Sequence, residues 1–252
     1  MDEATLHHWL TVAQIVLAGL TLLVLSVVRA PYGRHYRGGW GPQVPSWLGW
    51  VLMECPAVLC FCGVYALGAH RAGLVPLLLL ALWQGHYVHR TFVYPLGLRS
   101  KHRPMPVAVV GAGLAFNTLN AYVNARWISH LGSYADAWLL EPRLWIGVAV
   151  FATGYAINKR ADRMLLALRR PGETGYQIPR GWLYELVSCP NYLGEIMEWV
   201  GWAIATWSLP GLAFALYTAA NVGPRALANH RWYRETFPNY PRHRRALVPF
   251  VL

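Results

Sequence analysis

Long apolar stretches separated by short basic segments dominate this sequence, and they limit the folds that it can adopt. A helix needs about 20 mostly apolar residues to cross a lipid bilayer. A sixth stretch, at about 193–224, is long enough for two helices and is interrupted at 208–211 by Pro and Gly, which favour a turn. We therefore expect an all-α, polytopic integral membrane protein with seven transmembrane helices. The five earlier stretches are residues 9–28, 46–68, 73–95, 105–127 and 143–159.

The composition separates this chain from ordinary soluble proteins. Charged residues make up 13% of the sequence and hydrophobic residues 56%, whereas a soluble domain has roughly 25% charged residues. The 13 Trp and 14 Tyr suit the aromatic belts at the two surfaces of a bilayer. The composition thus argues against a soluble fold with an unusually apolar core.

The positions of Lys and Arg predict the orientation of the helices. Cytoplasmic loops of membrane proteins carry an excess of these residues. With the N-terminus outside, the cytosolic segments hold 18 of the 22 Lys and Arg. We therefore expect a cytosolic C-terminus, and this topology accounts for the net charge of +11 without a nucleic-acid partner. The cytosolic segments are residues 29–45, 96–104, 159–192 and 225–252.

Glu54 lies in the middle of the second apolar stretch. An unpaired carboxylate there would cost several kcal/mol, so this side chain should be protonated, paired or functional. A neutral acid in this position could donate a hydrogen bond to a carbonyl group. The alternative is a polar contact that only holds two helices together. Pro56 is expected to bend this helix and to free backbone groups for such a polar site.

The third apolar stretch carries polar residues near its inner end. Tyr87, Arg90 and Tyr94 follow i, i+3, i+7 spacing, which places them on one helical face. Such a face needs a polar cavity or a charged ligand, although Arg90 could also reach the membrane interface. His86 and His89 lack the spacing of membrane di-iron enzymes, and the four Cys form no C-x-x-C pair. We therefore expect no metal site.

Three further polar faces follow helical spacing at the expected cytosolic ends of helices. Each alone could be a solvated stripe. Together, and near several Arg, they predict a site for a large anionic ligand such as a phosphorylated nucleotide, because Arg binds phosphate through two hydrogen bonds. Neither a Rossmann glycine fingerprint nor a Walker A string is present. The faces consist of Asn158, Asp162, Leu165 and Arg169; of Asn191, Glu195, Glu198 and Trp202; and of Arg225, Asn229 and Tyr233.

Three strings of residues resemble the steroid 5α-reductase family. They are GHYVHRTFVYPL from residue 85, the long string from Ile157 to Pro210, and HRWYRETFPNYPRHRRALVPF from residue 230. The long string contains PGETGYQIPRGWLYELVSCPNYLGEIMEW, which is too specific to arise from composition alone. Weaker similarity extends to trans-2-enoyl-CoA reductases, polyprenol reductases and membrane sterol reductases.

This resemblance implies a seven-helix membrane enzyme that uses NADPH to reduce the C4–C5 double bond of a 3-oxo-Δ4 steroid. The catalytic glutamate and tyrosine of the family match Glu54 and Tyr87. By that analogy both hydrogen-bond to the C3 carbonyl and stabilise the enolate that develops there. Hydride from the nicotinamide goes to C5 and a proton goes to C4, and the Tyr87 hydroxyl can give or relay that proton.

The resemblance also implies a division of roles within one domain of residues 1–252. Residues 1–127 would supply the substrate-polarising groups, and residues 143–252 would supply most NADPH contacts. The implied partners are a steroid and the lipid bilayer, and we expect a monomer in a bacterial inner membrane or in the endoplasmic reticulum. The implied NADPH-binding residues are Tyr32, Arg90, Tyr94, Arg103, Asn158, Asp162, Arg169, Tyr176, Asn191, Glu195, Arg225, Tyr233 and Arg244.

Two positions depart from the family pattern. Met53 replaces the glutamine that usually precedes the catalytic glutamate, which removes a polar neighbour of Glu54. Asn229 stands where the family often has a run of histidines, and it keeps hydrogen-bonding capacity without charge.

Three alternatives stay open at the level of the sequence. A related membrane enoyl reductase would act on a polyprenol or a trans-2-enoyl-CoA, although the pair Glu54 and Tyr87 favours an enone. A membrane methyltransferase that uses S-adenosylmethionine could share the PNYLGE-like tail but would not need that pair. A transporter with a polar pathway would have little need for Glu54 beside Tyr87.

Overall fold

The computed structural model describes residues 1–31, 33–98, 102–168 and 175–252. Within these ranges the chain is mostly helical, as predicted, with one short antiparallel pair of strands. The α-helices are α1 (Glu3–Val27), α2 (Ser46–Ala66), α3 (Leu74–Val88), α4 (Tyr94–Gly97), α5 (Val107–Arg126), α6 (Pro142–Ala167), α7 (Pro190–Thr206) and α8 (Leu209–Thr236). The strands are β1 (Gln43–Pro45) and β2 (Pro104–Pro106), with Val44 opposite Met105. Short π-helical segments are η2 (His89–Val93) and η3 (Trp127–Leu131), and short 3₁₀ segments are η1 (Gly33–His35), η4 (Asp136–Leu140) and η5 (Trp182–Glu185).

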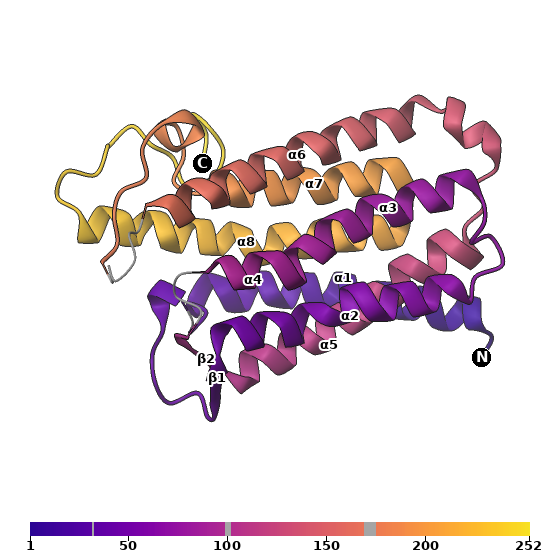
Figure 1. Cartoon of the computed structure of the whole chain (residues 1–252), viewed down its shortest axis with the longest axis horizontal. Coiled ribbons are helices and arrows are strands. Elements are labelled where there is room, and N and C mark those ends of the chain that lie inside the picture. Colours follow the sequence, from indigo (N-terminus) through magenta and orange to yellow (C-terminus); the bar gives the residue numbers. More distant parts are fainter. Residues whose placement is uncertain (32, 99–101, 169–174) are drawn as a thin grey trace.

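The helices form an elongated bundle and run along its long direction (Figure 1). The closely packed pairs are α2 with α5, α1 with α8, and α6 with α7, while α8 also packs on α7. The N-terminus lies at one end, and β1, β2 and the C-terminal segment lie at the other (Figure 1). The described parts of the segments predicted to be cytosolic therefore gather at one end of the bundle.

The predicted apolar stretches correspond to helices. The interruption in the sixth stretch is confirmed, because α7 ends at Thr206 and α8 begins at Leu209. Trp207 adopts a left-handed conformation with φ of 45°, and the Ser208 hydroxyl accepts a hydrogen bond from the Gly211 N–H. The third stretch differs from a single helix, since α3 continues through the π-helical turn η2 into α4.

Among the described residues, α1 and α2 are the two helices long and apolar enough to cross a membrane. Polar and charged side chains interrupt the apolar surface of the later helices, and α3 is shorter than a full span before η2 extends it. The seven spans and their orientation stay predictions.

Aromatic side chains fill the centre of the bundle. Trp83 on α3 is completely buried and donates from Nε1 to the carbonyl oxygen of Ala57 on α2 at 2.8 Å. Its ring lies 5.4 Å from that of Trp199 and 5.5 Å from that of Phe214, measured between ring centroids. This cluster joins four helices and fixes where the polar residues of α3 and α7 meet.

Helices α6 and α7 approach each other at two pairs of glycines. Gly154 faces Gly194, and Gly147 faces Gly201, so that a Cβ atom at any of the four would overlap backbone of the opposite helix. Small residues of this kind let two helix backbones come close enough for direct contact between polar main-chain and side-chain groups. The contact aligns the polar face of α6 with that of α7.

Candidate active site

A cavity of about 280 Å³ lies at the end of the bundle where the predicted cytosolic segments gather. It lies between the ends of α1, α6, α7 and α8 and the segment around β2. The structure brings ten of the predicted cofactor-binding residues to its wall. They are Arg90, Tyr94, Arg103, Asn158, Asp162, Tyr176, Asn191, Glu195, Arg225 and Tyr233.

Three predicted residues are not among those that line the cavity. Tyr32 and Arg169 lie outside the described residues. Arg244 is buried and donates from Nη1 to the carbonyl oxygen of Pro179 at 2.9 Å and from Nη2 to Glu185 at 3.2 Å. In this structure Arg244 supports the segment before α7, and its direct contact with a cofactor stays a prediction.

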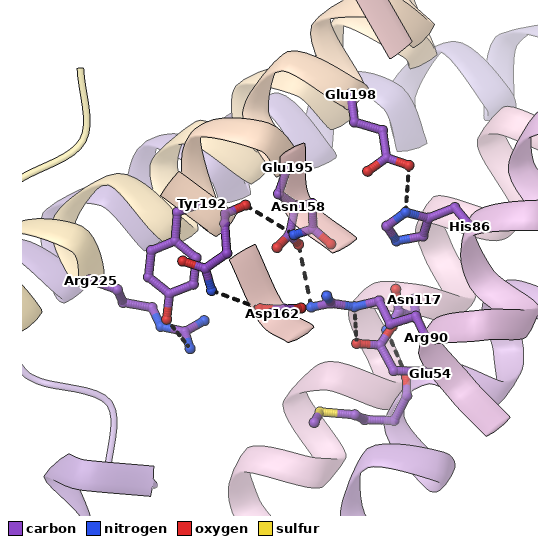
Figure 2. A network of polar contacts seen from close by, with 12 residues as sticks. Glu54, His86, Arg90, Asn117, Asn158, Asp162, Tyr192, Glu195, Glu198 and Arg225 are labelled. Atoms are coloured by element: carbon purple, nitrogen blue, oxygen red, sulfur yellow. Dashed lines mark hydrogen bonds and ion pairs between the residues drawn. The ribbon is translucent and has the colours of Figure 1, made fainter. Parts of the chain in front are cut away.

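Arg90 joins the cavity wall to the interior of the bundle (Figure 2). Its Nε donates to Glu54 Oε1 at 3.0 Å, and its Nη2 lies 3.3 Å from Glu195 Oε1. The Arg90 side chain begins in the π-helical turn η2, a local widening that often occurs at functional sites. One guanidinium from this turn thus connects α2 with α7.

Both carboxyl oxygens of Glu54 have partners. Arg90 contacts Oε1, and the amide of Asn117 on α5 donates to Oε2 at 3.2 Å and to the Met53 carbonyl oxygen at 2.6 Å. Of the states predicted for this side chain, the structure therefore has the paired one. Asn117 is a polar neighbour of Glu54 that sequence reasoning missed, because the contact joins residues 63 positions apart.

The Met53 side chain does not face the Glu54 network. It packs with Met105 and Val110 in a buried apolar cluster and lies against Gly113 of α5. The side chain at this position thus fills space between α2 and α5. Asn117 provides an amide beside Glu54, where Met53 has none.

Tyr87 is 3% exposed and is enclosed by aromatic rings. Its ring centroid lies 4.9 Å from that of Trp83, 5.6 Å from that of Trp199 and 4.8 Å from that of His86. In the part of the chain that the structure describes, no hydrogen bond joins Tyr87 to Glu54. Their joint action on one substrate group stays a prediction.

The polar faces of α6 and α7 meet as the close helix contact requires. The Asn158 amide donates to the Asn191 carbonyl oxygen at 3.0 Å, and the Asn191 amide donates to Asp162 Oδ1 at 3.1 Å. Asn158 Oδ1 is buried and has no partner. On α8, Arg225 donates to the Tyr192 hydroxyl at 3.3 Å (Figure 2). The wall is therefore preorganised, and among its described residues Asn158 Oδ1 is a buried acceptor without a partner.

Arg34 is a cavity residue that the sequence reasoning missed. Its guanidinium carbon lies 4.7 Å from the ring centroid of Tyr233, 4.9 Å from that of Trp232 and 5.4 Å from that of Tyr176. Its Nη1 is buried without a partner. In the sequence, Arg34 is only one of the basic residues of the predicted cytosolic segment 29–45, since no helical spacing connects it to the other polar faces.

His35 and Cys189 complete the described wall with neutral groups. His35 Nε2 lies 3.1 Å from Asn229 Oδ1, and burial lowers the pKa of the imidazole. Burial also raises the pKa of the Cys189 thiol to about 11, so the thiol stays protonated at neutral pH. The positive charge of the cavity therefore comes from its arginines.

The C-terminal segment holds the cavity floor in place. The Ser188 N–H donates to the Arg245 carbonyl oxygen at 2.8 Å, and the Cys189 N–H donates to that of Ala246 at 3.1 Å. The Ser188 hydroxyl lies 2.6 Å from both His230 Nδ1 and the Tyr240 hydroxyl. These contacts fix the residues that begin α7.

The described cavity residues suit a phosphorylated dinucleotide. Arginines supply positive charge, tyrosines supply flat stacking surfaces, and Arg34 Nη1 and Asn158 Oδ1 are a buried donor and a buried acceptor that each lack a partner. Buried polar groups without partners are costly, so such atoms indicate a polar ligand. No group of three or more His, Cys, Asp or Glu placed to hold a metal ion occurs among the described residues.

Comparison with known proteins gives consistent matches over the chain. The family described as 3-oxo-5-alpha-steroid 4-dehydrogenase matches residues 103–252. Steroid 5-alpha-reductase DET2 of Gossypium hirsutum is 43% identical over 99% of this chain and 99% of its own length. The corresponding protein of Arabidopsis thaliana is 43% identical over 92% of this chain and 91% of its own. The protein named 3-oxo-5-alpha-steroid 4-dehydrogenase 1 of Homo sapiens is 41% identical over 87% of this chain and 85% of its own.

Proposed function

The chain belongs to the 3-oxo-5-alpha-steroid 4-dehydrogenase family of oxidoreductases, and on that premise we propose that it reduces the C4–C5 double bond of 3-oxo-Δ4 steroids with NADPH. The observation that carries the proposal is the position of Arg90. This residue lines a cavity suited to a dinucleotide and contacts Glu54, a carboxyl buried among apolar helices.

NADPH would occupy the arginine-lined cavity and would supply a hydride to the substrate. Arg34, Arg103 and Arg225 provide the positive charge for its phosphates, and Asn158 Oδ1 offers an acceptor to the amide or hydroxyl groups of the cofactor. Tyr176 and Tyr233 present rings at the same wall. All of these residues except Arg34 are among those that the family resemblance implies for NADPH binding.

The steroid would lie on the membrane side of Arg90, where Glu54 and Tyr87 would hydrogen-bond to its C3 carbonyl oxygen. The Arg90 guanidinium contacts both Glu54 and Glu195 and would hold the Glu54 side chain beside the substrate. Both donors would then stabilise the enolate formed by hydride addition to C5.

The apolar substrate and the helix pattern support placement in a bilayer. We propose a monomer with seven spans, an outer N-terminus and a cytosolic cavity, in a bacterial inner membrane or in the endoplasmic reticulum. The two helices that meet the length and apolar requirements, α1 and α2, are the starting point of this topology. Cysteine accessibility at the two ends of the bundle would test the orientation.

Purified protein incubated with NADPH and testosterone tests the proposed reaction. We expect a 5α-dihydro product by mass and chromatography, together with oxidation of an equal amount of NADPH. Folded protein, checked by its unfolding temperature, that makes no such product would refute the steroid reaction.

Two conservative variants test the substrate-side residues. Glu54→Gln and Tyr87→Phe should each lower turnover about 10²-fold or more, as expected for loss of a transition-state hydrogen bond. NADPH binding should survive in both, because neither side chain lines the cavity. Near-normal turnover in either variant would show that its assigned role is wrong.

A further inference from the structure

A second acid–base pair lies one helical turn further into the bundle than Arg90 and Glu195. His86 Nδ1 lies 2.6 Å from Glu198 Oε1, and the two side chains are 1% and 0% exposed. His86 lies on α3, four residues before Arg90 of η2, and Glu198 follows Glu195 by three on α7. The contacts Arg90–Glu195 and His86–Glu198 therefore follow one another, one helical turn apart, between the same two helical segments. Figure 2 shows the His86–Glu198 contact on the side of Arg90 away from Arg225.

The His86–Glu198 pair does not belong to the cofactor cavity. Arg90 and Glu195 line that cavity, whereas His86 and Glu198 do not. Helix association alone does not require an ionisable pair, since a neutral amide would form the same kind of contact. Ionisable groups buried at this depth are costly and usually have a function.

The pair lies directly beside Tyr87. His86 and Glu198 are each followed by an aromatic residue, Tyr87 on the third helix and Trp199 on α7. The His86 ring is 4.8 Å from both the Tyr87 ring and the Trp199 ring, between centroids, and the last two are 5.6 Å apart. A proton held by the pair would thus be stored next to the hydroxyl-bearing residue of the proposed reaction.

Lys159 and Tyr155, on another face of α6, lie near the pair. Asn158 and Asp162 face the cofactor cavity, and Lys159 follows Asn158 on a different side of the helix. Lys159 Nζ lies 5.0 Å from the ring centroid of Tyr155, whose ring is 6.3 Å from that of His86. Lys159 also interacts electrostatically with Glu198, whose Oε2 is buried without a hydrogen-bond partner.

We propose that His86 and Glu198 form a proton store that supplies the C4 proton through Tyr87, and that Lys159 lies on its path of refilling. This inference rests on the proposed enone reduction. Hydride addition to C5 leaves an enolate, which takes the Tyr87 hydroxyl proton at C4 to give the saturated ketone. The Tyr87 phenolate then takes a proton from the pair, and one proton from the cytosol restores it.

Such a store is needed because the cofactor fills the water-facing cavity during the reaction. Each turnover consumes one proton at a place that bulk water does not reach by that path. In this proposal His86 and Glu198 do not touch the substrate, and they act by returning a proton to Tyr87. The charged and titratable groups that face the pair are Lys159 and Tyr155 from α6, Tyr87 from α3, His89 and Arg90 from η2, and Glu195 from α7.

The variant Glu198→Gln keeps the size and the hydrogen-bonding capacity of the side chain and removes its titratable proton. With NADPH and testosterone we expect turnover at pH 8 to fall about 10²-fold, the scale of acid–base assistance. The loss should become smaller as the pH is lowered to 6, because the variant depends on protons from bulk water. Turnover in D₂O should also slow more for the variant than for the parent protein.

The binding of NADPH and the unfolding temperature serve as readouts that do not depend on turnover. Both should stay close to the parent values in Glu198→Gln. Gln14→Met is the matched control, since it removes another buried interhelical hydrogen bond, from Gln14 Nε2 to Asn120 Oδ1 at 2.9 Å, without removing a proton carrier. It should leave the pH profile and the D₂O effect unchanged.

The outcomes separate the proton store from the reaction itself. A loss in Glu198→Gln that is equal at every pH, with an unchanged D₂O effect, would mean that the pair only holds the helices together and would overturn the proposal. Undiminished turnover at pH 8 would overturn it as well. Absence of steroid product from the parent protein would refute the proposed function before the variants are compared.

Discussion

Arg90 Nε lies 3.0 Å from Glu54 Oε1, and this contact connects the buried carboxyl group of α2 with the wall of the arginine-lined cavity. Arg90 also contacts Glu195 through Nη2 at 3.3 Å. A change at the cavity wall can therefore alter the position of Glu54 through one side chain. In the proposed reaction, Arg90 would be shared by the cofactor side and the substrate side.

The substitution Arg90→Gln should destabilise the protein and weaken NADPH binding. It leaves two buried carboxyl groups without their counter-charge, and breaking a buried pair costs about 3–5 kcal/mol. The partial exposure of the Arg90 side chain, 18%, places the effect at or below the lower end of this range. Unfolding temperature and NADPH titration measure the two effects.

Adding Glu54→Gln to Arg90→Gln should recover part of the lost stability, because one uncompensated carboxyl group disappears. We expect a coupling energy of about 1–3 kcal/mol in the double-mutant cycle. Arg143→Gln is the control, since its contact with Glu141 is only partly buried and surface pairs contribute about 0–1 kcal/mol. Additive effects of the two buried substitutions would contradict the shared role of Arg90.

Arg34→Gln should weaken NADPH binding about 10-fold or more, because a charge-assisted hydrogen bond contributes roughly 1.5–3 kcal/mol. The matched control is Arg37→Gln. Arg37 is an exposed arginine of the same loop that does not line the cavity. Calorimetric titration with NADPH measures both, and equal affinities of the two variants would remove Arg34 from the cofactor site.

Gly154→Ala should push α6 and α7 apart and misalign the polar faces that they share. The added Cβ would overlap Glu198 and Gly194 backbone, and overpacking of this kind costs about 1–3 kcal/mol. Gly111→Ala on α5 meets nothing within 4 Å and should be neutral or slightly stabilising. Unfolding temperatures of the two variants compare the sites, and a neutral Gly154→Ala would mean that the helices can separate without cost.

The contact between Glu185 and Arg244 should make stability depend on pH. The Gly181 N–H and then Arg244 Nη2 hold the pKa of the Glu185 carboxyl below its usual value of 4.5. This group therefore contributes stability above pH 4.5, and the contribution is lost as the pH falls through its lower folded pKa. The difference in unfolding temperature between parent and Glu185→Gln should be largest at pH 7 and should shrink toward pH 4.

Glu235→Gln, at an exposed position near the end of α8, provides the comparison for that measurement. It should change the unfolding temperature little at either pH. A difference for Glu185→Gln that stays constant from pH 7 to pH 4 would contradict the ionised contact with Arg244.

The helices and the polar helix faces of the cavity wall could be predicted because both depend on local periodicity. Apolar length located the helices, Pro and Gly located the break before α8, and i, i+3, i+4 spacing placed Asn158 with Asp162 and Asn191 with Glu195. The family resemblance added Arg103 and Tyr176, for which spacing gave no signal.

Contacts between distant segments could not be predicted in the same way. The spacing grouped Glu198 with Asn191 and Glu195, but it could not reveal that Glu198 meets His86 one turn below the cavity. The Asn117 amide and the Arg34 guanidinium reach the site from α5 and from a loop, so their partners depend on how helices pack. Met53 shows the same limit, since only packing reveals that its side chain faces Gly113.

The central claim is that hydride reaches C5 of a 3-oxo-Δ4 steroid while a proton reaches C4. Testosterone should therefore be incubated with NADPH that carries deuterium at both C4 positions of the nicotinamide, and the product analysed by mass and by NMR. We predict a 5α-dihydro steroid with one deuterium at C5 and none at C4. A product with deuterium at C4, or a reduced product without deuterium at C5, would contradict this account.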